Sequence, residues 1–426
     1  MPFSILTGLQ WGDEGKGKMI DVLAADADAV ARFSGGANAG HTVRIDGRSF
    51  VLHQLPTGLL REGVAGMIGS ACVVDPVALM RELGELAEMG MSVGERLRIS
   101  GKVHLVHPAY RLLERSEEAS RGRGAIGTTG RAIGPTYGAK FARRGLRLED
   151  AACAADFARM AAEISRRTAE ELDLSESDRS RLSDETEEFV SLSGELVSLA
   201  GDVSLAANGI LDRDGLLFAE GAQGSMLDPD HGTYPYVTCG SCVSGAACVS
   251  LGVGPGRVDE VVGVAKAYST RVGAGPLPTE QEGEVGDLIR ERGNEYGATT
   301  GRPRRCGWLD GVLLRYTARI NGCSWIALTL LDVLSGFDSL QVCRRYELDP
   351  EVDAPIFETG RRLGRHSPVY ETLPGWSEDI SGETDWDRLP EEARGYVEYV
   401  EKLVGVPVRA VSTGPGREHM IWRDIG

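Results

Sequence analysis

The sequence predicts an α/β fold: a single large domain with a central, mostly parallel sheet flanked by helices, and a P-loop-like core. Residues 3–6 are an apolar run that stops at a glycine-rich stretch, and residues 19–24 form an apolar, helix-periodic segment after it. This strand–loop–helix order is typical of a nucleotide-binding unit. Two later apolar segments, 258–267 and 325–331, have the length and composition of buried strands or other core segments.

The segments between these elements predict loops and surface helices. Gly and Pro cluster at 252–256 and 272–278, which predicts loops. In 151–200, charged residues and Ser alternate with Leu, Ala and Val at three- and four-residue spacing. This spacing predicts helices packed on one face, with a structural role. The chain has no repeat of fixed period and no low-complexity linker. We therefore expect residues 1–426 to form one domain that includes this helical segment.

The composition excludes several classes of function. Of 426 residues, 46 are Lys or Arg and 63 are Asp or Glu, giving a formal charge of −17. Nucleic acids and acidic membranes are polyanions, so we expect neither as a partner. The sequence has no run of about 18 consecutive apolar residues that would predict a membrane span. Its first residues lack the pattern of a signal peptide, so we expect a cytoplasmic location.

The cysteines do not predict a metal or redox site. Eight are scattered through the chain, far below the density of a disulfide scaffold, so we expect reduced thiols. Cys239 and Cys242 do have CxxC spacing, and Cys248 is nearby. A zinc site needs a second Cys or His pair, and none follows at suitable spacing. Small, half-buried side chains beside a binding loop are the expected role.

The glycine-rich loop resembles a P-loop with one part missing. Glycines let backbone N–H groups converge on phosphate oxygens, and Lys16 adds a charge at a helix N-terminus. An ordinary P-loop separates its outer glycines by four residues and follows its lysine with Ser or Thr. Here six residues separate Gly8 from Gly15, and Gly17 follows Lys16. The hydroxyl that holds Mg²⁺ is therefore absent, and Asp13 is the natural replacement as an oxygen ligand of the metal. Asp13 could also act as a base toward the substrate.

The motifs of this chain resemble, nearly from end to end, those of the adenylosuccinate synthetase family. QWGDEGKGK at 10–18 is followed by GGANAGHT at 35–42. Further matches are GTTGRAIGP at 127–135, ARRG at 142–145, EGAQG at 220–224, HGTYPYVT at 231–238, KAYSTRVGAGP at 266–276, GATTGRPRR at 297–305, GWLD at 307–310 and STGP at 412–415. The resemblance implies a ligase that forms adenylosuccinate from IMP, L-aspartate and GTP with Mg²⁺, through 6-phosphoryl-IMP, in the first committed step of AMP synthesis.

The resemblance also implies how the chemistry is divided. Asp13 would remove the N1 proton of IMP, so that the 6-oxygen attacks the γ-phosphate of GTP. His41 would be the acid that stabilises the developing charge. Mg²⁺ would lie on Asp13 and the carbonyl of Gly40. A carboxylate and an imidazole suit these roles because one accepts and the other donates a proton near neutral pH.

The resemblance implies binding residues in these motifs and in the segment 329–332. The guanidinium groups among them suit the carboxylates of aspartate. Arg143 is implied to reach the IMP phosphate of the neighbouring subunit in a C2 homodimer. The GTP residues are Gly12, Asp13, Glu14, Gly15, Lys16, Gly17, Lys18, Gly40, His41, Thr42, Arg304, Leu330, Leu331, Asp332, Ser412, Thr413 and Gly414. The IMP residues are Asp13, Lys16, Asn38, His41, Thr129, Arg143, Gln223, Thr238 and Arg302. The aspartate residues are Thr299, Thr300, Gly301, Arg302 and Arg304.

Two segments depart from the family pattern. The family carries Thr-Lys-Leu-Asp where this chain has TLLD at 329–332. Asp332 keeps the acceptor for guanine, whereas Leu330 removes a charge beside the ring, so we expect GTP to bind with altered affinity or weaker discrimination. The residues after Thr238 also differ, which leaves open another acceptor, such as dGMP or a nucleoside-antibiotic intermediate. A GTP-binding switch is a further alternative, although it has no need of an aspartate loop.

Overall fold

The fold is organised around one ten-stranded sheet. The computed structural model describes residues 2–45, 48–297, 301–347 and 363–423. The strands lie in the order β19-β18-β15-β11-β1-β10-β2-β5-β7-β9, and only the β18–β19 pair is antiparallel. Their bounds are β1 Phe3–Gly8, β2 Ala29–Arg32, β5 Ala65–Ile68, β7 Leu97–Ser100, β9 Ala200–Gly201, β10 Leu217–Glu220, β11 Glu260–Lys266, β15 Trp325–Thr329, β18 Val408–Ser412 and β19 Met420–Trp422.

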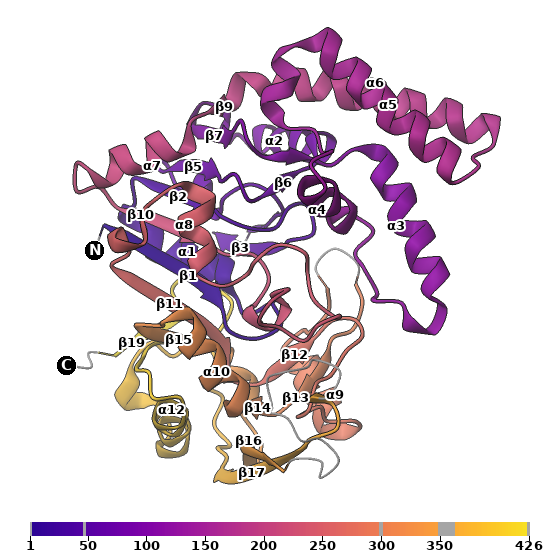
Figure 1. Cartoon of the computed structure of the whole chain (residues 1–426). Helices are drawn as coiled ribbons and strands as arrows, with labels where there is room; N and C mark the ends of the chain where they lie inside the picture. Colours follow the sequence, from indigo (N-terminus) through magenta and orange to yellow (C-terminus); the bar gives the residue numbers. More distant parts are fainter. Residues whose placement is uncertain (1, 46–47, 298–300, 348–362, 424–426) are drawn as a thin grey trace.

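Helices cover this sheet, as Figure 1 shows, and several begin at side-chain caps. Asp75, Ser175 and Asp310 each accept a hydrogen bond from a backbone N–H of the first turn of the helix that follows. The helices are α1 Lys16–Leu23, α2 Pro76–Glu88, α3 Pro108–Arg121, α4 Ile133–Phe141, α5 Ala154–Glu171, α6 Glu176–Leu196, α7 Val203–Leu211, α8 Gly245–Leu251, α9 Glu284–Arg292, α10 Gly311–Asn321 and α12 Glu391–Val404.

Short sheets extend the structure beyond the central one. The hairpin of β3 (His41–Ile45) and β4 (Arg48–Leu52) follows the second glycine-rich motif. The other pairs are β6 (Val73–Val74) with β8 (His104–Leu105), and β12 (Ser269–Arg271) with β13 (Arg305–Gly307). The strands β14 (Leu309–Asp310), β16 (Ser339–Glu347) and β17 (Ser367–Pro374) form a three-stranded sheet.

The central strands are buried because helices lie over the sheet. Every residue of β1 and of β10 is buried, and β11 and β15 are buried almost throughout. Such continuous apolar runs are typical of parallel strands covered on both faces. The mostly parallel α/β fold predicted from the sequence is therefore confirmed. The buried segments predicted at 258–267 and 325–331 correspond to β11 and β15.

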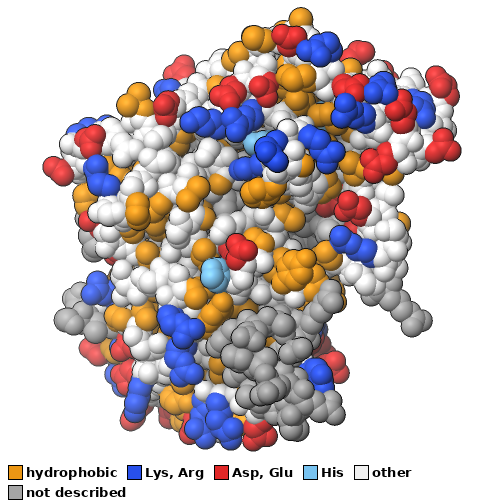
Figure 2. Space-filling view, viewed as in Figure 1, with side chains coloured by type: hydrophobic (Ala, Val, Ile, Leu, Met, Phe, Trp, Pro, Cys, Tyr) orange, Lys and Arg blue, Asp and Glu red, His pale blue; other side chains and the backbone are white. Residues whose placement is uncertain are grey.

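The segment 151–200 forms two long helices at the periphery. Helices α5 and α6 pack on each other at the top of the molecule, away from β1 (Figure 1). In the space-filling view, Lys, Arg, Asp and Glu side chains gather over this region (Figure 2). Phe157 and Phe189 stack on the inner side of the pair, with ring centroids 5.6 Å apart. No described helix is long and apolar enough to cross a membrane.

The parallel topology determines where a site can form. The carboxyl ends of β1, β2, β10, β11 and β15 all lie along one edge of the sheet. In open α/β sheets, ligands bind in the crevice outside these ends. The segments that follow them contain the motifs singled out in the sequence, so residues far apart in the chain meet at this edge.

Candidate functional site

The loop between β1 and α1 is shaped from beneath by Glu14. Its side chain is fully buried, and its carboxylate accepts hydrogen bonds from the backbone N–H of Gln10 at 3.0 Å and of Gly12 at 2.9 Å. Lys16 pairs with the other carboxylate oxygen at 2.5 Å. Gly12 and Gly15 adopt φ of 91° and 87°, which favour glycine. The side chain of Glu14, one of the predicted GTP-binding residues, therefore supports the loop from inside.

Asp13 sits on the open side of the same loop. Its side chain is 35% exposed, and its backbone has a positive φ of 60°. Arg304 pairs with its carboxylate at 2.9 Å. Burial acts to raise the pKa of Asp13, but the charges of Arg304, Lys266 and Lys16 outweigh it and hold the pKa below its usual value. The carboxylate is therefore ionised at neutral pH and can accept a proton or bind a cation.

Arg304 is itself held by a buried acidic residue, Glu295. Glu295 is 1% exposed, and its carboxylate accepts hydrogen bonds from Arg304 at 2.7 Å, Lys266 at 2.5 Å and Tyr268 at 2.6 Å. Two cations thus share one buried carboxylate. This arrangement fixes the guanidinium of Arg304 beside Asp13.

Replacing Glu295 by Gln is expected to lower the free energy of unfolding by about 3 kcal/mol, because it leaves the buried ammonium of Lys266 without its counter-charge and removes one of the two carboxylates that pair with Arg304. Urea unfolding measures the loss. Glu280→Gln is the matched control: Glu280 pairs with Arg305 at a position where both side chains are partly exposed. This control is expected to lose less than about 1 kcal/mol. Equal losses in the two variants would refute the structural role of Glu295.

His41 begins strand β3 beside the phosphate loop. A Cβ atom on Gly17 would lie 3.1 Å from the Cβ of His41, so the two backbones approach closely. His41 is 6% exposed, and its Nδ1 contacts the carboxylate of Glu220, at the carboxyl end of β10. Thr57 also donates to Glu220, through its backbone N–H at 2.8 Å and its hydroxyl at 2.6 Å. Glu220 thus fixes the ring and leaves Nε2 available to a ligand.

The positive charge of Arg32 lies beside the pair formed by His41 and Glu220. Burial and the charge of Arg32 lower the pKa of His41, while Glu220 acts in the opposite direction. Burial would raise the pKa of Glu220, but His41, Arg32 and Thr57 bring it down to about 2. Glu220 is therefore a carboxylate at every working pH.

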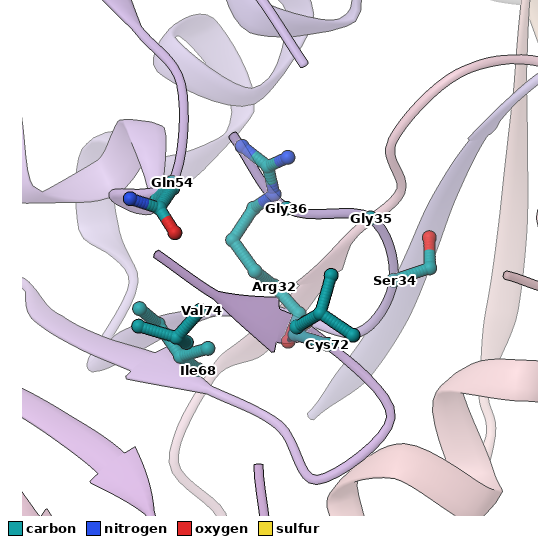
Figure 3. Close-up of a pocket in the computed structure, with 9 residues that line it drawn as sticks. Arg32, Ser34, Gly35, Gly36, Gln54, Ile68, Cys72 and Val74 are labelled. Atoms are coloured by element: carbon teal, nitrogen blue, oxygen red, sulfur yellow. Dashed lines mark hydrogen bonds between the residues drawn. The ribbon is translucent and has the colours of Figure 1, made fainter. Parts of the chain in front are cut away.

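Arg32 borders a small cavity on the inner side of the site. It is 1% exposed and lies 3.8 Å from Glu220, and its Nε and Nη1 have no hydrogen-bond partner among the described residues. Figure 3 shows its guanidinium between Gln54 and Gly36, beside a cavity of about 10 Å³. That volume suits about one water molecule, which would satisfy these donors.

Residues of β15 and of the loop after β18 also contact the phosphate loop. Thr329, at the end of β15, donates from its hydroxyl to the carbonyl of Glu14 at 2.7 Å. The ammonium of Lys18 donates to the Ser412 hydroxyl and the Gly414 carbonyl, each at 2.7 Å. Burial lowers the pKa of Lys18 to about 8. The turn after β15 and the loop after β18 are thereby joined to the phosphate loop.

The purine-binding positions at 330–332 differ in where their side chains go. Leu330 adopts a positive φ of 59°, is half-buried and packs against the hydrophobic cluster that contains Leu328. Leu331 is fully buried. Asp332 has a buried carboxylate oxygen with no hydrogen-bond partner among the described residues, and burial raises its pKa. The carboxylate of Asp332 therefore has an oxygen that is available to accept a hydrogen bond from a ligand.

Two of the predicted IMP residues, Gln223 and Asn38, lie beside the glycine-rich loops. The side-chain amide of Gln223 is buried with neither polar atom paired within the described ranges, and its backbone lies against Gly12. Asn38 accepts from the Gly36 backbone N–H at 3.2 Å. The remaining predicted residues are Thr238, which is half-buried, and the exposed Thr129 and Arg143.

The predicted aspartate loop is described only in part. Thr299 and Thr300 lie outside the described residues. The backbone N–H of Gly301 donates to the Gly297 carbonyl at 2.8 Å, and that of Gly297 to the Arg302 carbonyl at 2.9 Å, so the loop turns back on itself. Arg302 is exposed, and Arg304 points inward to Asp13.

The sequence did not predict Glu220, Thr57 or Glu295 as site residues. Glu220 stands inside the motif EGAQG, where an acid that follows three buried strand residues was an available signal. Thr57 and Glu295 carried no signal in the sequence. The cysteines pair neither with one another nor with a metal-ligating cluster: all eight are free thiols, and no group of three His, Cys, Asp or Glu suited to a metal exists in the described ranges.

Comparisons with known proteins agree along the whole chain. The family model described as adenylosuccinate synthetase matches residues 5–421. Adenylosuccinate synthetase of Desulfatibacillum aliphaticivorans is 47% identical over 99% of this chain and 98% of its own length. The Myxococcus xanthus protein of that name is 46% identical over 98% of this chain and 97% of its own.

Two solved structures share the fold. A fully ligated adenylosuccinate synthetase from Plasmodium falciparum superimposes with a TM-score of 0.93, at 36% identity and 99% coverage of both chains. A cyanophage S-2L succinoaminodeoxyadenylate synthetase, bound to dGMP and to dATP as an energy donor, has a TM-score of 0.64 at 20% identity, covering 100% of this chain and 96% of its own. That second likeness concerns the fold alone.

Proposed function

Because the chain belongs to the adenylosuccinate synthetase family and catalyses the GTP-dependent ligation of L-aspartate to IMP, we propose that Asp13 and His41 are its catalytic pair. One observation carries the proposal. Gly12 lies against Gln223, and Gly17 lies against His41, so the phosphate loop, the acid–base residues and an unpaired amide meet at one edge of the sheet. A GTP-binding switch would need only part of this set.

The first step of the reaction is a proton transfer followed by phosphoryl transfer. Asp13 takes the N1 proton of IMP, and the 6-oxygen then attacks the γ-phosphate of GTP. Arg304 keeps Asp13 ionised for this role. Glu220 holds the Nδ1 side of His41 and favours the protonated ring, the form in which Nε2 carries a proton to donate to the transferred group. The amine of aspartate then displaces the phosphate from carbon 6.

Positioning and charge neutralisation supply the rest of the catalysis. The residues proposed for GTP are the loop from Gly12 to Lys18, the turn that contains Asp332 and the loop at 412–414. Arg302 and Arg304 are proposed to bind the carboxylates of aspartate, because guanidinium groups bind carboxylates through two parallel hydrogen bonds. IMP is proposed to contact Asn38, Gln223, Thr129 and Thr238.

Mg²⁺ fits the donors present at the loop. Mg²⁺ takes one or two carboxylates and completes its shell with phosphates and water. The partly exposed carboxylate of Asp13 and the half-buried Gly40 backbone match that requirement. When bound there, the ion would neutralise charge on the phosphates of GTP.

The experiment that tests the function is a purine absorbance assay with IMP, aspartate and either GTP or ATP. Adenylosuccinate should form with GTP at least about tenfold more efficiently than with ATP, because Asp332 accepts from the donors of guanine and would face the N1 acceptor of adenine. Replacing IMP by dGMP should give no product. No product with IMP would overturn the assignment, and a preference for ATP would overturn the role of Asp332.

A C2 homodimer with a shared site is proposed from Arg143. Arg143 is exposed just beyond α4, with a positive φ of 60°, beside the exposed Phe141. Mixing inactive Asp13→Asn and Arg143→Leu subunits should restore activity, to about one quarter of the wild-type value for random exchange, because each mixed dimer contains one intact site. Mixed subunits that stay inactive while they exchange would rule out a contribution in trans.

Residues 1–426 are proposed to act as one functional domain in the cytoplasm. The strands of the central sheet come from both ends of the chain, so no part of it closes the site alone. The eight free thiols suit a reducing compartment.

A further inference from the structure

Arg271 is a buried cation without a carboxylate partner. Its side chain is 2% exposed and forms no ion pair with the described residues. Burial and the charge of Arg305 lower the pKa of Arg271 to about 9. Burying a charge without a counter-ion is costly unless hydrogen bonds compensate for the lost water. The motif KAYSTRVGAGP at 266–276 contains Arg271, which is not among the predicted site residues.

The guanidinium of Arg271 donates to three backbone carbonyls and one hydroxyl. Nε donates to the Ala274 carbonyl at 3.0 Å, and Nη1 to the Pro276 carbonyl at 3.0 Å. Nη1 also donates to Oγ1 of Thr233 at 2.9 Å, and Nη2 donates to the Tyr236 carbonyl at 2.9 Å. Arg271 therefore joins the turn that follows it to the motif HGTYPYVT.

The turn at 273–276 is also held by Arg305. Arg271 and Arg305 are paired across strands β12 and β13, and Nη1 of Arg305 donates to the Gly275 carbonyl at 2.7 Å. Gly275 has a φ of 105°, and a Cβ atom there would lie 2.4 Å from Nη2 of Arg271. A side chain at this position would displace the guanidinium and strain the backbone. Two guanidinium groups therefore fix the turn.

Both segments held by Arg271 adjoin residues that are proposed to contact IMP. The turn approaches the segment before Thr129, because a Cβ atom on Gly273 would lie 3.6 Å from the carbonyl oxygen of Ile126. Thr238 ends the motif HGTYPYVT, in which Arg271 binds two residues. Since Arg271 is buried, it acts on this part of the site through the two segments.

The phosphate loop contacts Arg271 through Trp11 but has supports of its own. The guanidinium carbon of Arg271 lies 5.5 Å from the centre of the Trp11 ring. Trp11 also packs in the hydrophobic cluster that contains Met226 and Leu277. The shape of the loop depends on Glu14, whose carboxylate accepts from two backbone N–H groups. Loss of the Arg271 side chain should therefore affect the binding of IMP far more than the binding of GTP.

We propose that Arg271 is a positioning residue for IMP: by joining its turn to the motif HGTYPYVT, it fixes Thr238 and Thr129 in the geometry that binds the nucleotide. The inference rests on the proposed function, since Thr238 and Thr129 are proposed contacts of IMP. A guanidinium suits this role because its donors point in several directions from one buried position. An ammonium would keep the charge but has its donors on a single atom, so lysine can satisfy these acceptors only in part.

The test compares the affinities of the full-length protein for IMP, by titration calorimetry, and for GDP, by competition against fluorescent methylanthraniloyl-GDP. Arg271→Met removes the charge and every donor. It should weaken the binding of IMP about thirtyfold and that of GDP less than about threefold, because misplaced binding groups are costly. Arg271→Lys should weaken IMP only about fivefold, since it keeps some of the donors. Equal changes for IMP and GDP, unchanged binding of IMP, or an Arg271→Lys protein as weak as Arg271→Met would overturn the inference.

Arg96→Met is the matched control for a purely structural role. Arg96 also donates to three backbone carbonyls, those of Leu59, Arg61 and Val64, and none of these residues is among the predicted site residues. Its replacement should lower the midpoint of urea unfolding, as Arg271→Met does, but should leave the affinity for IMP within about twofold of wild type. An equal loss of IMP binding in the two variants would refute the specific role of Arg271.

A second variant tests the same contact in a protein that keeps Arg271. Thr233→Val removes one acceptor of the guanidinium and nearly keeps the shape of the side chain. It should weaken the binding of IMP by about threefold to tenfold and leave GDP unchanged. Unchanged affinity for IMP would contradict the inference. Because these measurements need no turnover, a wild-type protein that binds IMP but forms no adenylosuccinate would contradict the proposed catalytic pair and not the role of Arg271.

Discussion

Asp13→Asn is expected to lower kcat by about a thousandfold, within the range for loss of a general base. The amide keeps the size of the side chain but cannot accept the N1 proton of IMP. It also removes the charge that pairs with Arg304 at 2.9 Å. The measurement is the steady-state rate of adenylosuccinate formation at saturating IMP, aspartate and GTP.

The control for this variant is the affinity for GDP, measured by fluorescence competition. Asp13 lies on the open side of the loop, whereas the loop shape depends on Glu14, whose carboxylate accepts from two backbone N–H groups. GDP binding should therefore change by less than about threefold. A kcat within tenfold of wild type would remove Asp13 from the role of base. Loss of GDP binding together with kcat would indicate a collapsed loop instead.

His41→Asn is expected to lower kcat by a similar factor, about a thousandfold, because the only acid proposed to face the transferred phosphoryl group is lost. Glu220→Gln is the informative partner. Its carboxylate holds the Nδ1 side of His41 and accepts two hydrogen bonds from Thr57. Glu220→Gln keeps the shape but removes the charge, so kcat should fall by about ten- to a hundredfold with little change in KM.

The double variant separates positioning from direct chemistry. If Glu220 acts through His41, then His41→Asn with Glu220→Gln should be no slower than His41→Asn alone. Losses that multiply would show that Glu220 acts independently of His41. Thr57→Val, which removes one donor to Glu220, should give a smaller loss of kcat in the same direction.

The arrangement around Glu220 and Glu295 has a common physical logic. Each residue of the proposed catalytic pair is held by a fully buried acid that is paired with cations. Glu295 holds Asp13 through Arg304, and Glu220, beside Arg32, holds His41. Buried carboxylates are costly unless they are paired and hydrogen-bonded. Glu220 and Glu295 are both paired and hydrogen-bonded, and these same contacts hold His41 and Arg304 in place.

The sequence by itself determined the fold class, the family and the strings that surround the chemistry. A strand, a glycine-rich loop and a helix are local patterns, and QWGDEGKGK and GGANAGHT bring their own geometry because glycine permits positive φ and close backbone approach. Asp13 and His41 could therefore be named as candidates from spacing and motif. The missing P-loop hydroxyl was also visible without a structure.

Only the tertiary structure decided which residues support that pair. Glu220 and Glu295 lie far from His41 and Asp13 in sequence. Glu220 meets His41 because β10 ends at the same edge of the sheet as β1, and Glu295 reaches Asp13 through Arg304. The structure also shows that the side chain of Glu14 is buried under the loop and that Leu330 packs against the hydrophobic cluster, which the motif alone does not specify. The physical reason is that burial and pairing depend on neighbours that a linear pattern does not contain.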